Sequence, residues 1–591
     1  MTEQEILDRL ATLPSGGITI KKFKAPSGKT YEYPYLQWTE DGKQKSRRLS
    51  EDEVDRVAAL LSERKELEAL LRSKDYPATS NIIGKPEFLT NVIIGNPLHA
   101  LVESVRGYRK REGYRDVRDY VHGPTTNKVF VLYGLRRTGK TTIIQQVIAD
   151  MDEESFERTA FVQISAKDKF ADLNKDLKFL QSRGFRNVFI DEVTLMEDFI
   201  EGAALLSDIY ASSGMKIVLT GTDSLGFWIA KSNELFDRCV LLHTTFISYR
   251  EFSYVLGIDG IDDYIRYGGT MSLSGEHYNP AFVNKGTTDE YVDSAIAQNI
   301  QRSLKHYQYE GHFRHLYGLY EKGELTGAIN RVIEDMNHRF TLEVLQREFK
   351  SNDLKISANN LRKDRYNPST VLDDIDVDAF THRLKEMLSI KNKGEQIVLL
   401  DEGHVSEIEE YLRALDLIDY IDVLDIGFAG SSNKRIVFTQ PGLRYAQAKF
   451  FVDSLADDPL FQSLSIEERT RINGRVLNEI KGRMAEDIIL LETKLAYPDM
   501  KVFKLQFADG EFDMVVADPN ALESEIYEIK YSKEAVREQA RHMMDQDKCE
   551  AASYRFGRIR KKTVLYRGEN IPVDENGIEY RNIEAYLKAL E

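Results

Sequence analysis

The sequence predicts a multidomain α/β protein, and three observations lead to this fold class. The chain has 591 residues, which at about 150 residues per domain corresponds to roughly four domains. Apolar, strand-like runs alternate with helical patterns from residue 84 to residue 270, which is typical of a parallel sheet covered by helices. Near the C-terminal end, three strand-like runs follow a long helical pattern. We therefore expect four domains, over residues 1–75, 84–270, 271–455 and 465–591.

The composition is that of a globular protein, and it limits the function classes. Hydrophobic residues make up 42% and charged residues 30% of the chain, which argues against a long disordered or low-complexity protein. The net charge of −16 excludes a histone-like polycation, so any contact with nucleic acid must use local basic patches. Two cysteines, Cys239 and Cys549, are too few for a disulfide framework or a four-cysteine metal site. Because the opening residues are acidic and no run approaches about 18 apolar residues, we expect a cytoplasmic protein with no membrane span.

Residues 1–75 combine a small basic sheet with a helix. Strand-forming and polar residues alternate from Ile18 to Ser50, and Ser50 with Glu53 three residues later is a helix-capping signal. Tyrosines and a tryptophan are interleaved with eight basic residues: Lys21, Lys22, Lys24, Lys29, Lys43, Lys45, Arg47 and Arg48. Such a sheet can stack bases and neutralise phosphates. Equally, its aromatic face can pack on the helix while the lysines solvate the strand edges, and both interpretations stay open.

Two further segments are interpreted from their patterns alone. The basic stretch from Arg106 to Arg118 includes Arg111 and is partly balanced by acidic residues. It indicates a solvated helix face or a surface that faces DNA or another subunit. Residues 271–455 are mostly helical and end in the run RIVFTQPGL. This pattern predicts a helix-rich lid followed by a winged-helix-like unit.

A glycine-rich loop between a strand and a helix predicts a phosphate-binding site. Residues 134–141, GLRRTGKT, match the pattern G-x-x-x-x-G-K-[ST] after the apolar run 129–133. In such a loop the backbone N–H groups and the helix N-terminus bind the β-phosphate, the lysine reaches the β and γ oxygens, and the threonine hydroxyl binds Mg²⁺. The residues expected to bind ATP are Gly134, Arg137, Thr138, Gly139, Lys140, Thr141 and Thr142. The alternative, a chance turn before a helix, is disfavoured by the strand described next.

A second apolar strand ends in two carboxylates, Asp191 and Glu192. Asp191 is expected to hold Mg²⁺ together with Thr141, and Glu192 to orient and polarise the attacking water. A third strand, at residues 216–221, is followed by Thr222 and Asp223. Because the carboxyl ends of parallel strands meet at one edge, Thr222 is expected to contact the γ-phosphate.

Together these motifs resemble a prokaryotic AAA+ ATPase family whose members carry a C-terminal domain of PD-(D/E)XK nuclease-like fold. The resemblance rests on GLRRTGKTT, VFIDEV, VLTGTDS and FDRCVLLHTTFISYREF, and it covers about residues 84–590. It implies a homo-oligomer in which Arg238 is the arginine finger. Phe246 replaces the expected proline, and GTD at 221–223 replaces the usual GSS. The alternative for Arg238 is a surface arginine or a salt bridge.

Charged residues on the last strands predict a second site. Asp513 lies on one strand, and Glu528 and Lys530 share one face of the next because the strand period is two. Two carboxylates bind Mg²⁺ or Mn²⁺, and a nearby ammonium assists the attacking water or neutralises developing charge, which is the chemistry of phosphodiester cleavage. Glu486, on the preceding helix, is the expected further metal ligand, and Gln539 is a weaker candidate. The alternative is a charged strand edge in a fold that does not cleave.

We therefore expect an ATP-dependent AAA+ ATPase that controls a Mg²⁺-dependent nuclease-like domain and acts on DNA, including foreign or mobile DNA. ATP and Mg²⁺ are the expected cofactors. The competing hypothesis is a nucleotide-switched DNA-binding or scaffold protein whose nuclease-like domain only binds.

Overall fold

The computed structural model divides into two compact units, Met1–Glu87 and Phe88–Glu591. In the first it describes residues 13, 17–24, 30–40, 43–50, 53–54, 56–58, 60–61 and 64. In the second it describes residues 88–196, 198–222, 237–271, 285–306, 313–350, 400–426, 432–454, 462 and 465–590. Within these ranges, no helix has the length and apolar character needed to cross a membrane.

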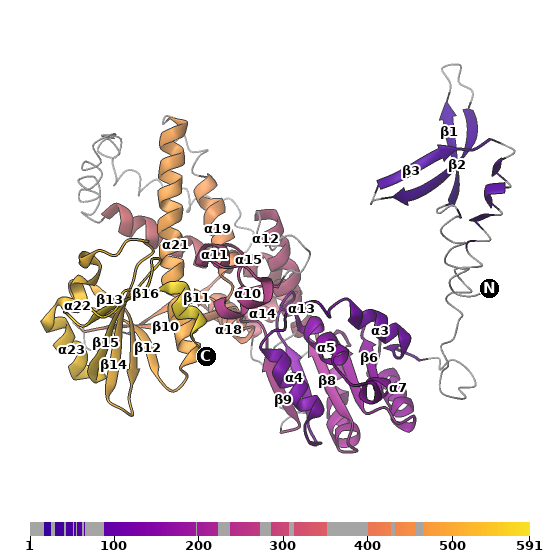
Figure 1. Cartoon of the computed structure of the whole chain (residues 1–591), viewed down its shortest axis with the longest axis horizontal. Helices are drawn as coiled ribbons and strands as arrows, with labels where there is room; N and C mark the ends of the chain where they lie inside the picture. The colour runs from indigo at the N-terminus through magenta and orange to yellow at the C-terminus, as the bar shows by residue number, and fades with distance from the viewer. Residues whose placement is uncertain are drawn as a thin grey trace. The chain divides into compact units, whose positions relative to one another are not determined.

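The first unit contains a three-stranded antiparallel sheet in the order β1-β2-β3 (Figure 1). The strands are β1 (Gly17–Lys24), β2 (Thr30–Glu40) and β3 (Lys43–Arg48). Leu36, Leu49 and Val57 form its small core. The Ser50 N–H donates to Glu53 Oε2 at 2.9 Å, so these two residues make the contact that the capping signal predicts.

A six-stranded sheet in the order β4-β6-β7-β8-β5-β9 forms the first part of the second unit. Its strands are β4 (Asn91–Ile93), β5 (Val129–Tyr133), β6 (Thr159–Gln163), β7 (Asn187–Asp191), β8 (Lys216–Gly221) and β9 (Cys239–His243). All pair in parallel except the edge strand β4, which is antiparallel to β6. The four inner strand-like runs of the sequence therefore form a parallel-sheet core, as predicted.

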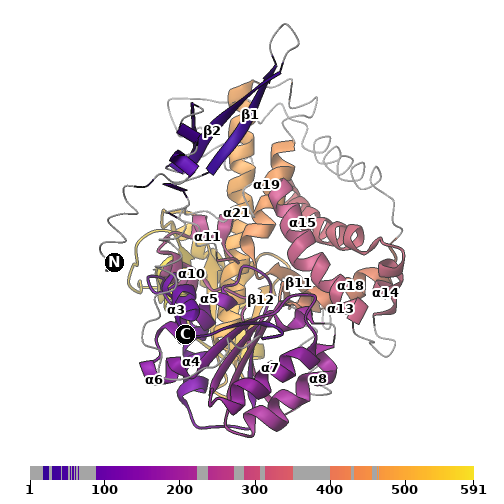
Figure 2. The same cartoon turned by 90° about the vertical axis from the view of Figure 1, so that its right-hand side faces the viewer.

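Helices cover both faces of this sheet (Figure 2). One face packs on α3 (Asn96–Glu103), α4 (Gly113–His122) and α5 (Lys140–Ala149). The other packs on α7 (Phe170–Ser182) and α8 (Phe199–Leu205). Successive strand residues alternate between the two cores; Val129 and Val131 face one and Phe130 and Leu132 the other. Because both faces are buried, the strands are apolar throughout rather than alternating.

Residues after the sheet are mostly helical. The helices are α10 (Tyr249–Leu256), α11 (Ile261–Tyr267), α12 (Lys285–Tyr291), α13 (Gln298–His306), α14 (Arg314–Glu321), α15 (Leu325–Lys350), α18 (Glu402–Ala414) and α19 (Pro441–Ser454). Part of this region, residues 351–399, lies outside the described residues. Residues 272–284, 307–312 and 427–431 also lie outside them. The described helices from α12 to α19 agree with the predicted helix-rich segment.

The C-terminal sheet has seven strands in the order β11-β10-β12-β13-β14-β15-β16 (Figure 1). They are β10 (Ile418–Asp425), β11 (Ser432–Phe438), β12 (Lys501–Gln506), β13 (Glu511–Asp518), β14 (Glu523–Ile529), β15 (Arg558–Tyr566) and β16 (Ile578–Asn582). The long helix α21 (Ile466–Ala496) precedes β12, α22 (Arg541–Met544) and α23 (Gln546–Phe556) precede β15, and α24 (Ile583–Lys588) ends the described chain.

The hairpin β10–β11 corrects the expected winged-helix-like unit. We expected residues 418–438, which form this hairpin, to belong to a region that ends at residue 455, apart from the last domain. Instead, β10 pairs in parallel with β12, with Asp422 opposite Phe503. Without the hairpin, β12 would be an edge strand with unpaired N–H and C=O groups. The hairpin is therefore the end of the C-terminal sheet and not a separate wing.

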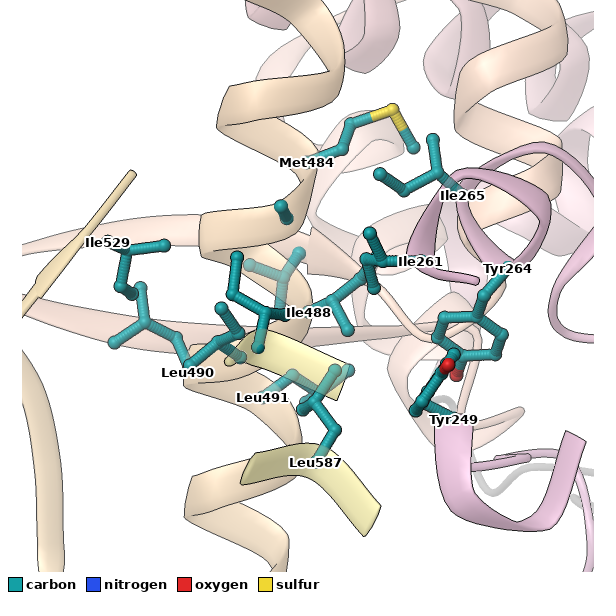
Figure 3. Close-up of a cluster of buried hydrophobic side chains, with 14 of the residues drawn as sticks. Tyr249, Ile261, Tyr264, Ile265, Met484, Ile488, Leu490, Leu491, Ile529 and Leu587 are labelled. Carbon is teal, nitrogen blue, oxygen red and sulfur yellow. The ribbon is translucent and has the colours of Figure 1, made fainter. Parts of the chain in front are cut away.

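A shared apolar core joins helices α10 and α11, which follow the six-stranded sheet, to the C-terminal sheet (Figure 3). Ile261 and Tyr264 on α11 pack among residues of α21 such as Ile488, and Leu587 of α24 lies in the same cluster. Because this core crosses the expected boundaries near residues 270 and 465, residues 88–591 form one compact unit rather than three.

Candidate functional site

The glycine-rich loop lies at the carboxyl end of β5, beside the ends of β7 and β8. Gly139 precedes α5 in a left-handed conformation, with φ of 82°. At Gly134 a Cβ atom would lie 2.7 Å from Thr244 Oγ1 and 2.9 Å from Thr245 Oγ1. Glycine is needed at residue 139 for its backbone angle. It is needed at residue 134 because the chain after β9 approaches too closely for a side chain.

The Lys140 side chain is buried inside the loop. Its ammonium donates to Gly134 O at 2.9 Å and to Leu135 O at 2.8 Å. Burial lowers the pKa of Lys140 to about 8. The loop therefore holds a cation at its centre, in the position expected to contact phosphate oxygens.

Asp191 connects the loop to the neighbouring strands. Thr141 Oγ1 donates to Asp191 Oδ2 at 3.0 Å, and Thr220 Oγ1 on β8 donates to Asp191 Oδ1. The Glu192 N–H in turn donates to Thr220 Oγ1 at 3.1 Å. From the sequence we named Thr141, Asp191 and Glu192 but missed Thr220. It could have been found because it is a polar residue near the end of the otherwise apolar run 217–220. Hydroxyl and carboxylate oxygens in this arrangement fit the ligands that Mg²⁺ prefers.

Glu192 has an uncommon backbone conformation, with φ of 57°. For a residue other than glycine this conformation costs about 1–3 kcal/mol and is concentrated at functional sites. Burial raises the pKa of the Glu192 carboxyl. Thr222 Oγ1 lies 3.4 Å from Glu192 Oε2, so Thr222 adjoins the carboxylate; Asp223 lies outside the described residues.

The other loop residues have separate partners. Thr138 Oγ1 donates to Leu135 O at 2.9 Å, and Thr142 is half-buried in the first turn of α5. Arg137 also has a positive φ, of 64°, and its exposed guanidinium lies 5.9 Å from the centre of the Tyr291 ring.

A buried ion pair that sequence reasoning missed supports the loop from behind. Arg111 and Glu251, 140 residues apart, form two parallel bonds of 2.7 Å. Their side chains are only 8% and 5% exposed. Arg111 also donates to Thr138 O in the loop and to Thr244 O. For Arg111, the prediction of a solvated or DNA-facing surface is therefore wrong, because its guanidinium is buried and neutralises the buried Glu251 carboxylate.

Arg238 lies away from the loop of its own chain. It directly precedes β9, so it stands at the amino ends of the parallel strands, whereas the loop stands at their carboxyl ends. Five strand residues separate the two edges by roughly 16 Å. Arg238 Nε pairs with Asp208 Oδ1 at 2.8 Å, which is the salt bridge that we considered as the alternative.

Asp513, Glu528 and Lys530 meet at a pocket of about 820 Å³ beside β13 and β14. The Lys530 ammonium lies 3.0 Å from Asp513 Oδ2 and 2.7 Å from Glu528 Oε2. Asp513 also accepts the Ile529 N–H at 2.8 Å. Glu528 Oε1 is buried and has no hydrogen-bond partner among the described residues. Burial, and next the Asp513 charge, raise the pKa of Glu528 to about 8.

Glu486 lines the same pocket, but its carboxylate is already surrounded by cations. Lys504 lies 2.6 Å, Arg483 2.9 Å and Arg435 3.0 Å from it. Burial alone would raise the pKa of Glu486, but these cations hold it well below its usual value. Within the described ranges, no group of three or more His, Cys, Asp or Glu side chains is arranged to hold a metal ion. Glu486 therefore does not join Asp513 and Glu528 in this conformation, and the two carboxylates that Lys530 bridges stay the predicted metal ligands.

Gln539 also lines the pocket, where its side-chain amide donates to Ser532 Oγ at 2.8 Å and to Glu534 O at 3.0 Å. In the first unit, the side chains of Lys45, Arg47 and Arg48 are exposed. The side chains of Lys21, Lys22, Lys24, Lys29 and Lys43 lie outside the described residues.

Two families match parts of this sequence. Residues 126–253, which include the glycine-rich loop, Asp191 and Arg238, match the family described as AAA domain. The chain contains an AAA domain. Residues 2–59 match a domain of unknown function, DUF6788. Among the curated proteins, none matches the sequence.

Three solved structures of other proteins show a distant likeness to this chain. An S. cerevisiae Hsp104–casein complex is 16% identical over 28% of this chain and 32% of that chain, with a TM-score of 0.23. An S. cerevisiae Hsp104–ADP complex is 13% identical over 68% of this chain and 54% of that chain, with a TM-score of 0.22. The Aeropyrum pernix ORC1 protein in complex with DNA is 13% identical over 60% of this chain and 95% of that chain, with a TM-score of 0.21. The chain thus spans about a third and about half of the two Hsp104 chains, and the assignment of the AAA domain rests on the family match.

Proposed function

We propose that this protein hydrolyses ATP at its AAA domain and that its C-terminal sheet carries a metal-dependent phosphodiesterase site that acts on DNA. The observation that carries the proposal is the convergence of Lys140, Thr141 and Asp191 at the carboxyl edge of the parallel sheet. It supports a nucleotide site because a buried ammonium and a hydroxyl at the N-terminus of α5 meet a carboxylate at the end of β7.

Four side chains at or beside the loop, and one from a neighbouring subunit, have roles in this proposal. Lys140 binds the β- and γ-phosphates, and Thr141 with Asp191 holds Mg²⁺, which neutralises phosphate charge when bound. Glu192 orients the attacking water, and the raised pKa of its carboxyl moves it toward the range of an effective general base. Arg238 stabilises the transferred phosphoryl group of a neighbouring subunit, so the proposal includes a homo-oligomer.

The charge of the C-terminal pocket supports a metal requirement. Seven acidic side chains line it, against three lysines and arginines: Glu343, Glu479, Glu486, Glu511, Asp513, Glu528 and Glu538, against Arg483, Lys530 and Arg541. The excess of carboxylates repels a phosphate backbone, and an added divalent cation offsets this repulsion. Asp513 and Glu528 would hold the cation, which activates water and neutralises charge when bound, and Lys530 would stabilise the developing charge.

DNA as the substrate is supported by the first unit. Lys45, Arg47 and Arg48 lie on one exposed strand, and the Arg48 guanidinium lies 3.6 Å from the centre of the Tyr33 ring. Cations beside aromatic rings are the usual means of binding single strands. The competing function is a nucleotide-switched DNA-binding or scaffold protein whose nuclease-like domain does not cleave, and the Arg48–Tyr33 contact fits both functions.

ATP hydrolysis is tested with three proteins. Lys140→Ala should abolish binding of a fluorescent ATP analogue. Glu192→Gln should bind the analogue with unchanged affinity and lose at least roughly a hundredfold in phosphate release, the scale of a positioned general base. Wild-type turnover in Glu192→Gln would contradict the role of this carboxylate.

Cleavage is tested separately with plasmid and single-stranded DNA in Mg²⁺ or Mn²⁺, with and without ATP. Asp513→Ala and Lys530→Ala should each lose cleavage and keep ATP hydrolysis. The matched control is Glu523→Ala, an acidic residue at the start of β14 that does not line the pocket. If the wild type binds DNA but cuts none with either ion, the scaffold function replaces the nuclease function.

A further inference from the structure

Helices α10 and α11 are held together as one rigid pair. The Gly260 N–H, at the start of α11, donates to the Tyr249 hydroxyl at 3.1 Å. The Tyr264 ring packs edge-on against Tyr249 and Phe252, with centroids 5.6 Å and 5.2 Å away. All three rings are buried, and Figure 3 shows Tyr249 and Tyr264 side by side. Because a close-packed core transmits displacement, a shift of α10 must also move α11.

One end of this pair contacts the nucleotide loop. Glu251, in the first turn of α10, holds Arg111 through two bonds of 2.7 Å. Arg111 donates directly to the carbonyl oxygen of Thr138, the residue before Gly139. The loop and α10 are thus separated by a single buried side chain, and a change in the loop backbone reaches Glu251 without passing through solvent.

The other end contacts the carboxylate pocket. Asp262, in the first turn of α11, accepts hydrogen bonds from Lys481, at 2.8 Å, and from Tyr531 and Arg567. Tyr531 lines the pocket and directly follows Lys530. Burial alone would raise the pKa of Asp262, but the bonds from Lys481 and Tyr531 lower it to about 2, so Asp262 stays charged near neutral pH.

We propose that Asp262 is a positioning residue of the carboxylate pocket that couples it to the nucleotide site. Binding of nucleotide moves the loop carbonyl that Arg111 holds, the α10–α11 pair moves with Glu251, and Asp262 shifts Tyr531 and thereby Lys530. The proposal rests on the proposed function and deepens it, since it assigns the path by which the ATP site controls the second site. No metal takes part in the path, so it can be tested without DNA cleavage.

The test is amide hydrogen exchange of residues 525–533, measured with and without saturating ADP at one constant Mg²⁺ concentration. This segment is informative because the Ile529 N–H donates to Asp513 and the Lys530 N–H to Leu565 O. In the wild type we expect ADP to change its exchange rate by roughly fivefold or more, the lower end of usual coupling between sites. Asp262→Asn should remove this ADP effect while ADP affinity, measured by titration, stays within about twofold.

The matched control is Asp259→Asn. Asp259 lies on the same α10–α11 segment and pairs with Lys588 at 2.6 Å, away from the pocket. It should keep the full ADP effect. If Asp262→Asn does not fold, Tyr531→Phe is used instead. It removes only the hydroxyl that donates a hydrogen bond to Asp262, and it should also lose the ADP effect.

Three outcomes would overturn the coupling. The first is a wild type that binds ADP with no change of exchange in residues 525–533. The second is an Asp262→Asn variant that exchanges faster but keeps the wild-type ADP effect, since Asp262 would then be only structural. The third is a wild type that binds no ADP, which would also remove the proposed function; the titration separates it from the first.

Discussion

The buried pair of Arg111 and Glu251 offers a sharp test of how the nucleotide loop is held. The Glu251 carboxylate is 5% exposed. Within the described part of the chain, Arg111→Ala would leave it with one donor, the Glu112 N–H at 2.8 Å. Removing one partner of a buried ion pair usually costs about 3–5 kcal/mol. Because a typical domain is stable by only about 5–15 kcal/mol, we expect a large fall in the free energy of unfolding, measured by urea titration.

A double variant separates stability from loop positioning. Replacing Arg111 by Met and Glu251 by Leu together removes both charges, and such replacements of buried pairs are often neutral or stabilising. We expect this double variant to recover most of the lost stability. It still lacks the donor to the Thr138 carbonyl oxygen, so its affinity for a fluorescent ATP analogue should be about tenfold weaker, which corresponds to about 1.4 kcal/mol.

Two results would refute this reasoning. A wild-type free energy of unfolding in Arg111→Ala would show that the pair is not desolvated as its burial indicates. A double variant with wild-type nucleotide affinity would show that Arg111 stabilises the fold without positioning the loop.

Three further predictions follow from contacts elsewhere in the chain. Thr220→Val removes the hydroxyl between Asp191 and Glu192, and should lower ATP turnover more than nucleotide affinity in a steady-state assay. Arg238→Ala should keep nucleotide affinity and lose turnover in a concentration-dependent assay, and a fully active monomer by light scattering would contradict its role in a neighbouring subunit. Burial raises the pKa of Glu492 from 4.5 to about 8, so the folded state keeps a proton that the unfolded state releases, and stability falls as pH rises from about 4.5 to about 8. Glu492→Gln should make thermal unfolding less dependent on pH over that interval.

The sequence predicted the features that depend on neighbouring residues. The glycine-rich loop, the strand before it and the helix after it come from one continuous segment, and their backbone is specified by that segment. Asp191 and Glu192 could be placed because an apolar run with a charged end is typical of a buried parallel strand. The period of two likewise placed Glu528 and Lys530 on one face of a strand, and Lys530 lies 2.7 Å from Glu528.

Features formed by distant segments could not be predicted in this way. The Arg111–Glu251 pair joins residues 140 positions apart, and neither residue stands out from its charged neighbours. The pairing of β10 with β12 likewise depends on α21 folding between them, so RIVFTQPGL was interpreted as part of a separate unit. For Glu486 the sequence did contain a useful observation, because Lys504 interrupts an apolar strand. A lysine there needs a buried carboxylate partner, and Lys504, which is 1% exposed, pairs with Glu486.

Lys504 contacts three carboxylates of the pocket at once, and replacing it tests whether Glu486 can serve as a metal ligand. Its ammonium lies 2.6 Å from Glu486, 2.9 Å from Glu511 and 3.6 Å from Asp513. Lys504→Met would leave these three carboxylates without their shared cation, so the variant should be less stable in the absence of metal. A divalent cation can then replace the ammonium, so Mn²⁺ should raise its melting temperature more than that of the wild type. Lys501→Met, at the exposed start of the same strand, should respond like the wild type. An equal Mn²⁺ shift in all three proteins would show that Glu486 contributes to the structure of the pocket and not to metal binding.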